Sequence, residues 1–281
     1  MSHIKYEIRY ASHPNDAKLY DTQRLRKEFL VETIFEQDMI NMVYTDYDRI
    51  IVGGAYPVTK SLSLDAIDPL KATYFLERRE LGIINIGGKA KITVDDEVIE
   101  LDYREALYLG RGTTKVVFES ADASKPAKLY FNSAPAHKSY PNKKVTLDDA
   151  ITVELGDLNS SNARKINKLI VHGVVDTCQL QMGMTEFKEG SVWNTMPAHT
   201  HSRRMEAYFY FEVPEDQAVV HFMGQPQETR HIFMHNEQAV ISPTWSIHAG
   251  AGTAKYTFIW GMGGENLDYG DMDTQQPSDL R

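Results

Sequence analysis

The stretch Pro197-Ala-His199-Thr-His201-Ser-Arg-Arg-Met-Glu206 places two imidazoles and a carboxylate close together in the chain. Side chains alternate between the two faces of a β-strand, so His199 and His201 are expected to point the same way. Glu206 is out of phase with them on an unbroken strand, and a turn or bulge before it must bring its carboxylate round. A third imidazole, His248, follows in the segment Pro243-Thr-Trp-Ser-Ile-His248. Together these residues predict a metal site built on β-strands.

Three imidazoles and one carboxylate form a ligand set that suits zinc, with iron, manganese, cobalt and nickel as competitors. Such a set leaves one or two coordination positions for water or a substrate oxygen, which Lewis-acid catalysis requires. Six of the ten histidines lie between residues 199 and 248, which favours a metal site over unrelated structural histidines. The remaining three in that interval are assigned to supporting or structural roles: His221, His231 and His235.

The rest of the chain has the pattern of an all-β protein. Short runs of β-branched and aromatic residues, separated by turn residues, recur from about residue 34 to 118 and again from about 168 to 260. Many short strands at this spacing are typical of a sandwich or a barrel. One short helix is expected over residues 23–30 with Thr22 as its N-cap, and residues 1–20 are expected to form an irregular arm.

A polar, proline-containing segment from residue 133 to about 164 is expected to link two domains. We therefore predict an N-terminal domain at residues 1–150 without metal ligands and a C-terminal domain at residues 151–281 that carries the metal site.

The two halves show a weak internal repeat. The segment Glu77-Arg-Arg-Glu80 can be aligned with Ser202-Arg-Arg-Met-Glu206, and residues 106–115 can be aligned with residues 239–248. In this alignment the first half has no counterpart of the two histidines of the opening stretch, and Lys115 takes the place of His248. The repeat therefore predicts two related barrels, of which only the second binds a metal.

Composition limits the classes of partner. Hydrophobic residues make up 42% of the 281 residues and charged residues 25%, as in ordinary globular proteins. The formal net charge of -9 argues against nucleic acid and anionic membranes as partners, since both attract basic surfaces. The N-terminus lacks the apolar core of a signal peptide, and the single cysteine, Cys178, excludes an internal disulfide. We therefore expect a cytoplasmic protein.

The pattern His199-x-His201-x4-Glu206 followed by Pro243-x4-His248 resembles the two motifs of the cupin superfamily, although Trp245 stands where the second motif usually has glycine. Longer strings that span nearly the whole chain resemble the 5-keto-4-deoxyuronate isomerase family. They include Asp21-Thr-Gln-Arg-Leu-Arg26, Tyr74-Phe-Leu-Glu-Arg-Arg-Glu-Leu-Gly82, Met223-Gly-Gln-Pro-Gln-Glu-Thr-Arg-His231 and Phe258-Ile-Trp-Gly-Met262.

This resemblance implies a bicupin, with two jelly-roll-like β-barrels and short helices. It also implies one Zn²⁺ per subunit, with four ligands: His199, His201, Glu206 and His248. The implied reaction is the aldose–ketose isomerisation of 5-dehydro-4-deoxy-D-glucuronate to 3-deoxy-D-glycero-2,5-hexodiulosonate in the degradation of pectin and other uronates. A homohexamer that acts on a small-molecule uronate is expected. Two alternatives stay open, namely a cupin Fe(II) dioxygenase and a non-catalytic sugar-binding cupin.

The isomerisation requires a base that moves a proton from C2 to C1, unless a metal-assisted hydride shift replaces that step. The candidates for the base near the motif are Glu228, His231, Tyr208 and Tyr210. The carboxylate of the substrate requires a cation. The candidates for that role are Arg203, Arg204, Arg164 and Lys168.

Overall fold

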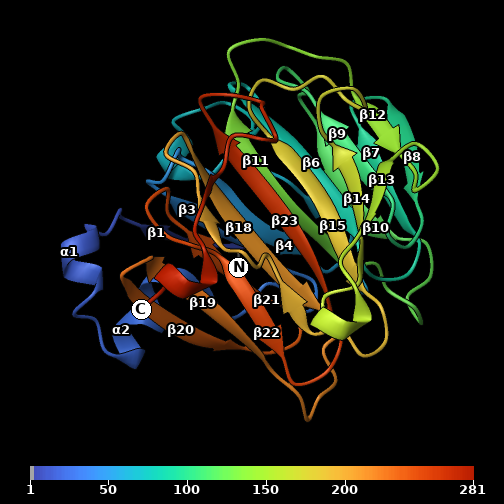
Figure 1. Ribbon diagram of the computed structural model, residues 1–281. Helices are drawn as coiled ribbons and strands as arrows, with labels where there is room; N and C mark the ends of the chain where they lie inside the picture. Colours follow the sequence, from blue (N-terminus) through green and yellow to red (C-terminus); the bar gives the residue numbers. More distant parts are fainter. Residues whose placement is uncertain (1–2) are drawn as a thin grey trace. The chain divides into compact units, whose positions relative to one another are not determined.

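The computed structural model describes residues 3–281, which consist mostly of β-strands (Figure 1). The α-helices within this range are short, and they are α1 (Pro14–Ala17) and α2 (Thr22–Phe29). Single 3-10 turns occur at Asp68–Leu70, Leu158–Ser160 and Pro277–Asp279. No helix in the described range is long and apolar enough to cross a membrane. The all-β fold class predicted from the sequence is confirmed.

The chain divides into two compact units. The first unit contains a seven-stranded sheet whose order is β1 (Ile4–Arg9), β3 (Ile40–Thr45), β4 (Ile51–Ala55), β11 (Leu129–Pro135), β6 (Arg79–Asn85), β9 (Ala106–Leu109) and β12 (Lys143–Val145). Its second sheet has four strands in the order β5 (Leu62–Ser63), β10 (Val116–Ser120), β7 (Ala90–Val94) and β8 (Glu97–Leu101).

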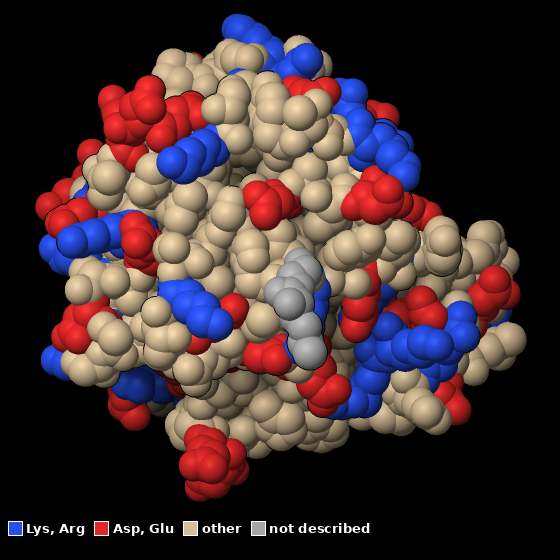
Figure 2. Space-filling view, turned by 180° about the vertical axis from the view of Figure 1, so that it is seen from behind, with Lys and Arg blue, Asp and Glu red and all other residues tan. Residues whose placement is uncertain are grey.

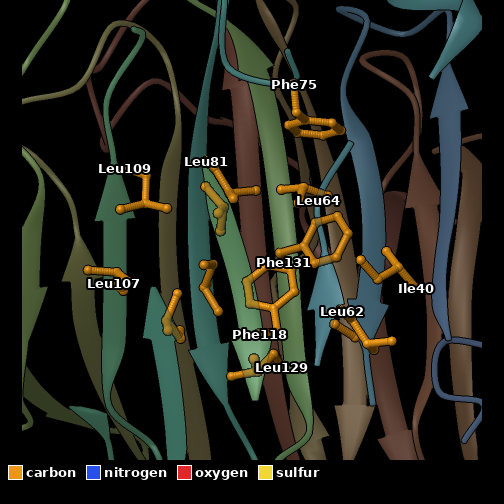
Figure 3. Packing of buried hydrophobic residues seen from close by; sticks show 14 of the residues in the cluster. Ile40, Leu62, Leu64, Phe75, Leu81, Leu107, Leu109, Phe118, Leu129 and Phe131 are labelled. Atoms are coloured by element: carbon orange, nitrogen blue, oxygen red, sulfur yellow. The ribbon is translucent and has the colours of Figure 1, made fainter. Parts of the chain in front are cut away.

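The core of the first unit is filled with large apolar side chains from both sheets. Phe131 and Leu81 from the larger sheet belong to the same buried cluster as Phe118 and Leu62 from the smaller sheet, and all four are at most 1% exposed. Figure 3 shows these side chains directed into the space between the strands. The two sheets are thus held together by apolar burial, which leaves a packed interior.

The second unit repeats this plan. Its larger sheet has the order β13 (Ile151–Leu155), β14 (Arg164–Ile170), β15 (Gln181–Phe187), β23 (Thr257–Gly264), β18 (Arg204–Phe211), β21 (Gln238–Ser242) and β2 (Leu30–Val31). The four-stranded sheet has the order β16 (Trp193–Asn194), β22 (Ala249–Gly252), β19 (Val219–Gln225) and β20 (Glu228–Met234). A separate two-stranded pair consists of β17 (His199–Thr200) and β24 (Asp273–Thr274).

The register of the strands supports the internal repeat. Leu81 of β6 pairs with Leu109 of β9, and Glu206 of β18 pairs with Ser242 of β21. Since the aligned segments place Leu109 over Ser242, Leu81 occupies in the first unit the position that Glu206 occupies in the second. Arg79 and Arg204, two residues earlier, correspond in the same way. The first unit therefore has a leucine in place of the carboxylate.

Each unit takes one segment from the other half of the sequence, and at these segments the units differ from the predicted continuous division into residues 1–150 and 151–281. Tyr10–Glu32 belongs to the second unit because Leu30 and Val31 form β2, which pairs with β21. The connection between β14 and β15, residues 171–180, belongs to the first unit, where the backbone N–H groups of residues 178–180 donate to the carboxylate of Glu80.

The N-terminal segment is more ordered than the sequence predicted. The expectation of an irregular arm is wrong for Ile4–Arg9, which forms β1 and pairs in parallel with β3. The helix expected over residues 23–30 is α2, but its N-cap is Asp21 rather than Thr22, because the Asp21 carboxylate accepts the N–H of Arg24 at 2.8 Å.

Charge on the surface is mixed. Figure 2 shows acidic and basic side chains interspersed over one face of the described residues. A nucleic-acid-binding surface would instead collect basic residues on one side.

Candidate metal centre and its cavity

Four side chains of the second unit converge on one point. The Nε2 atom of His248 lies 3.0 Å from Nε2 of His199 and 3.0 Å from Oε2 of Glu206. Nε2 of His201 lies 3.3 Å from the same carboxylate oxygen. The four ligand atoms all lie within 4.8 Å of one another. The structure thus brings together all four residues that the sequence nominated as metal ligands.

The local strand geometry explains this convergence. His199 lies in β17, His201 follows it directly, and Glu206 lies near the start of β18. The turn that the sequence required between them is formed by Ser202 and Arg203. His248 comes from the segment between β21 and β22.

The ionisation states suit a metal. Burial, together with the nearby His248, lowers the pKa of His199 to about 3, so its imidazole is neutral at neutral pH. Burial by itself would raise the pKa of Glu206, but His248 and His201 hold it well below its usual range. The centre therefore presents a carboxylate and a neutral imidazole without the loss of a proton at neutral pH.

Backbone carbonyls orient two of the rings. Nδ1 of His201 faces the carbonyl oxygen of Arg204 at 3.4 Å, and Nδ1 of His248 faces the carbonyl oxygen of Ser246 at 3.4 Å. An Nδ1–H that donates to a carbonyl leaves the Nε2 lone pair directed at the centre. This donor set of three imidazole nitrogens and one carboxylate oxygen fits a divalent d-block metal.

The cluster lies in a cavity of about 320 Å³ within the second unit. This volume is at the small end of ligand sites and suits a molecule the size of a monosaccharide. Strands β13, β14, β18 and β23 and the segments around residues 194–197 and 269–274 supply its walls. Its apolar and aromatic lining includes Val153, Leu155, Ile166, Met196, Pro197, Phe258, Trp260, Met262, Tyr269 and Met272.

Of the four candidates for the base, Tyr208 lines this cavity. Its ring lies edge-to-face against His248, with 5.4 Å between the ring centroids, and its hydroxyl lies 3.0 Å from Oγ1 of Thr195. Burial, reinforced by the charge of Glu206, raises the pKa of Tyr208 well above its ordinary value, so the phenol keeps its proton. Thr195 has a φ of 52°, which is unusual for a β-branched residue and often marks a functional position.

The other three candidates for the base do not line the cavity, so the structure does not support them in that role. The Tyr210 hydroxyl is buried against Nδ1 of His221 at 2.8 Å. Glu228 and His231 lie on β20, at the edge of the smaller sheet, where both are exposed. His221 is fully buried, which agrees with a structural role.

Three of the four cations that the sequence offered for the substrate carboxylate line the cavity. Arg164, Lys168 and Arg204 line the cavity, whereas Arg203 is exposed in the turn and does not. Sequence reasoning assigned no role to Thr195 or Tyr269. Their contacts depend on how distant segments fold over the cavity, and no local pattern predicts that.

Trp245, which departs from the usual cupin glycine, has a structural partner. Its ring packs edge-to-face on Phe29 of α2, with 6.2 Å between the centroids. The segment before His248 is therefore in contact with α2 of the same unit.

The chain is similar to known proteins over nearly its whole length. Residues 29–277 match the model of the KduI/IolB family. The chain belongs to the KduI/IolB family. Three relatives carry the name 4-deoxy-L-threo-5-hexosulose-uronate ketol-isomerase. The one from Bacteroides fragilis is 63% identical over 98% of this chain and 99% of its own. The one from Formosa agariphila is 61% identical over 99% of both chains, and the one from Escherichia coli is 58% identical over 98% of this chain and all of its own.

Solved structures agree with the fold of this KduI/IolB family chain. An IolB-like protein from Salmonella typhimurium is similar with a TM-score of 0.71 and 14% identity, over 88% of this chain and 96% of its own. Oxalate decarboxylase from Bacillus subtilis is similar with a TM-score of 0.56 and 9% identity, over 80% of this chain and 71% of its own. At such identities the likeness concerns the fold alone.

Proposed function

We propose that this chain is a ketol-isomerase that converts 5-dehydro-4-deoxy-D-glucuronate into 3-deoxy-D-glycero-2,5-hexodiulosonate during the degradation of pectin and related uronates, in the catabolism of glucuronate and galacturonate. The observation that carries the proposal is the identity of 57–63% with ketol-isomerases of that name over at least 98% of the chain. The monosaccharide-sized cavity around the histidine cluster, which consists of His199, His201, His248 and Glu206, supports it.

The proposed cofactor is one Zn²⁺ per subunit, held by His199, His201, Glu206 and His248. A bound zinc ion would act as a Lewis acid that polarises the substrate carbonyl and acidifies the neighbouring C–H bond. The protein supplies three imidazoles, of which that of His199 is neutral at neutral pH, and one ionised carboxylate at this position, and aromatic side chains line the surrounding cavity.

Tyr208 is the residue to which we assign proton transfer at the substrate oxygens. An aldose–ketose isomerisation exchanges the oxidation levels of C1 and C2, so one oxygen must gain a proton while the other loses one. A neutral phenol that is buried beside the histidine cluster and bonded to Thr195 can donate its proton and recover it. Deuterium placed at C2 distinguishes the two routes for the carbon-bound hydrogen. Loss to solvent indicates a proton transfer, and full retention at C1 indicates a hydride shift.

The direct test is to incubate the purified, zinc-loaded protein with 5-dehydro-4-deoxy-D-glucuronate under anaerobic conditions. We expect the ketose product to form without oxygen. Turnover that occurs only after Fe(II) and oxygen are added, and that consumes oxygen, would indicate the dioxygenase alternative. Binding of the uronate without any turnover would indicate the sugar-binding alternative, and either result would reject the isomerase.

We also propose that the protein acts as a cytoplasmic homohexamer. Support comes from the family resemblance and from the single cysteine, which is typical of a reducing compartment. Light scattering on the purified protein should give six times the chain mass of 32.0 kDa. A monomer mass at working concentration would exclude the hexamer.

A further inference from the structure

Strand β14 carries two cationic side chains to the cavity of the histidine cluster. Arg164 and Lys168 both line the cavity, and so does Ile166 between them. Alternate residues of a strand share one face, so these three form a single stripe along the wall. Both cationic residues are half-buried.

The cavity is richer in cations than in acids, although the formal net charge of the chain is -9. Of its described lining residues, Glu206 is the single carboxylate. Its Oε2 atom already faces Nε2 of His248 and His201 at 3.0 and 3.3 Å. A cation that is partly removed from water without an anionic partner is costly, and an anionic ligand offsets that cost.

The neighbours of the two cations orient them but do not neutralise them. The guanidinium of Arg164 donates to the carbonyl oxygen of Asn162 at 2.8 Å, and the nearest charged or titratable groups around it are tyrosines. Nζ of Lys168 lies 3.9 Å from the centre of the Tyr269 ring. Within residues 3–281, neither cation has a carboxylate partner. Burial lowers the pKa of Arg164, as expected of a cation without an anionic partner.

The third cation of the cavity is already engaged. The guanidinium of Arg204 donates to three backbone carbonyls of residues 268–271. Its counterpart in the first unit, Arg79, likewise donates to the backbone carbonyls of Arg49 and Ser133, both at 2.7 Å. The first residue of β18 and the first residue of β6 are thus arginines that bind backbone carbonyls. In the second unit this leaves Arg164 and Lys168 available for a ligand.

The first unit provides an internal comparison. Strand β3 occupies the second place in its sheet, as β14 does in the other sheet. Its sequence, Ile-Asn-Met-Val-Tyr-Thr, contains no lysine or arginine. The paired cations therefore accompany the histidine cluster and are not a general feature of this strand position.

The geometry points to Arg164 and Lys168 as the subsite that binds the carboxylate of a uronate whose carbonyl end lies at the histidine cluster. This inference rests on the proposed function. Arg164 offers the planar fork that matches a carboxylate, and Lys168, held against Tyr269, adds a second positive charge. A neutral hexose leaves both cations without a partner, so the subsite selects uronates.

The first test is the steady-state kinetics of Arg164→Met and Lys168→Met with 5-dehydro-4-deoxy-D-glucuronate. Loss of a charged hydrogen-bond partner should raise KM by about 10- to 100-fold for Arg164→Met and by a smaller factor for Lys168→Met, with the bound zinc unchanged. Arg203→Met is the matched control, because it removes the same charge from an exposed position outside the cavity. Unchanged KM values in both cavity variants would overturn the subsite.

The second test is competitive inhibition by D-glucuronate and by D-glucose, which differ at the carboxylate. The wild-type protein should prefer D-glucuronate, and Arg164→Met should lose the preference. If Arg164→Met does not fold, Arg164→Gln and Lys168→Met provide the same readout. If the wild-type protein does not isomerise the uronate, the proposed function fails, and calorimetric binding of D-glucuronate then decides the subsite by itself. Absence of that binding, or equal binding to Arg164→Met, rejects it.

Discussion

Tyr208 combines an apolar ring that packs on His248 with a hydroxyl that faces Thr195. Tyr208→Phe removes the hydroxyl and keeps the ring, so we expect the bound metal to stay and kcat to fall by about 10²- to 10⁴-fold, the usual range for loss of an acid–base group. Tyr210→Phe is the control, because its hydroxyl bonds to His221 away from the cavity lining. Equal losses of kcat in the two variants would assign the effect to packing.

His221 should make stability depend on pH. Burial lowers its pKa to about 3, whereas an unfolded histidine titrates near 6.5. Between these values the unfolded chain binds one proton more than the folded chain. The contribution is therefore complete above pH 6.5 and decreases as the pH falls, by up to about 1.4 kcal/mol per pH unit. Urea unfolding of the metal-free protein between pH 7 and 5 should show a smaller slope in His221→Gln. The same substitution at exposed His172 should leave the slope unchanged.

The sequence predicts the candidate metal ligands better than the candidate base. The four residues of the histidine cluster were predictable, because three of them come from adjacent short segments whose strand phase can be read. The choice between Tyr208 and Glu228 or His231 was not predictable. It depends on which strand faces the cavity and which forms an exposed edge of its sheet.

At the scale of elements, Glu80 fastens the segment Leu169–Met182 to β6. Its fully buried carboxylate accepts the N–H groups of Cys178, Gln179 and Leu180 at 2.7–2.9 Å and the hydroxyl of Tyr108 at 2.7 Å. Several charge-assisted bonds offset the cost of burying this carboxylate.

Removal of the Glu80 side chain leaves these donors without a partner. We expect Glu80→Ala to lower the free energy of unfolding by about 3–5 kcal/mol and Tyr108→Phe by about 1 kcal/mol. Urea denaturation measures both. Glu97→Ala, at an exposed position of β8, should stay within about 0.5 kcal/mol. A loss below 1 kcal/mol in Glu80→Ala would show that the segment is held mainly by its other contacts.

The strands of regular length were predictable from their apolar runs. The assignment of Tyr10–Glu32 to the second unit was not predictable in this way. β2 has only two residues, Leu30 and Val31, and no periodic signal shows that they pair with β21. Strand β1 likewise has no apolar run that predicts it, because four of its six side chains are exposed. It forms a strand through its parallel pairing with β3.

At the scale of the whole molecule, the same strand order serves two different interiors. Large apolar side chains fill the first unit, whereas the second unit has a cavity that is lined by two of the three histidines and by Glu206, which stands in place of leucine. The sequence repeat predicted this difference, since no histidine pair exists in the first half.

This difference predicts how the molecule responds to loss of metal. A ligand that binds only the folded state stabilises it by about 4 kcal/mol at a thousand times its Kd. Removal of zinc with a chelator should therefore lower the melting temperature in calorimetry, and added zinc should restore it. His248→Ala should bind almost no metal, retain its fold and melt at the same temperature with and without chelator. His231→Ala, at an exposed position, should behave like the wild-type protein. If His248→Ala kept a full equivalent of zinc and its activity, His248 would not be a metal ligand.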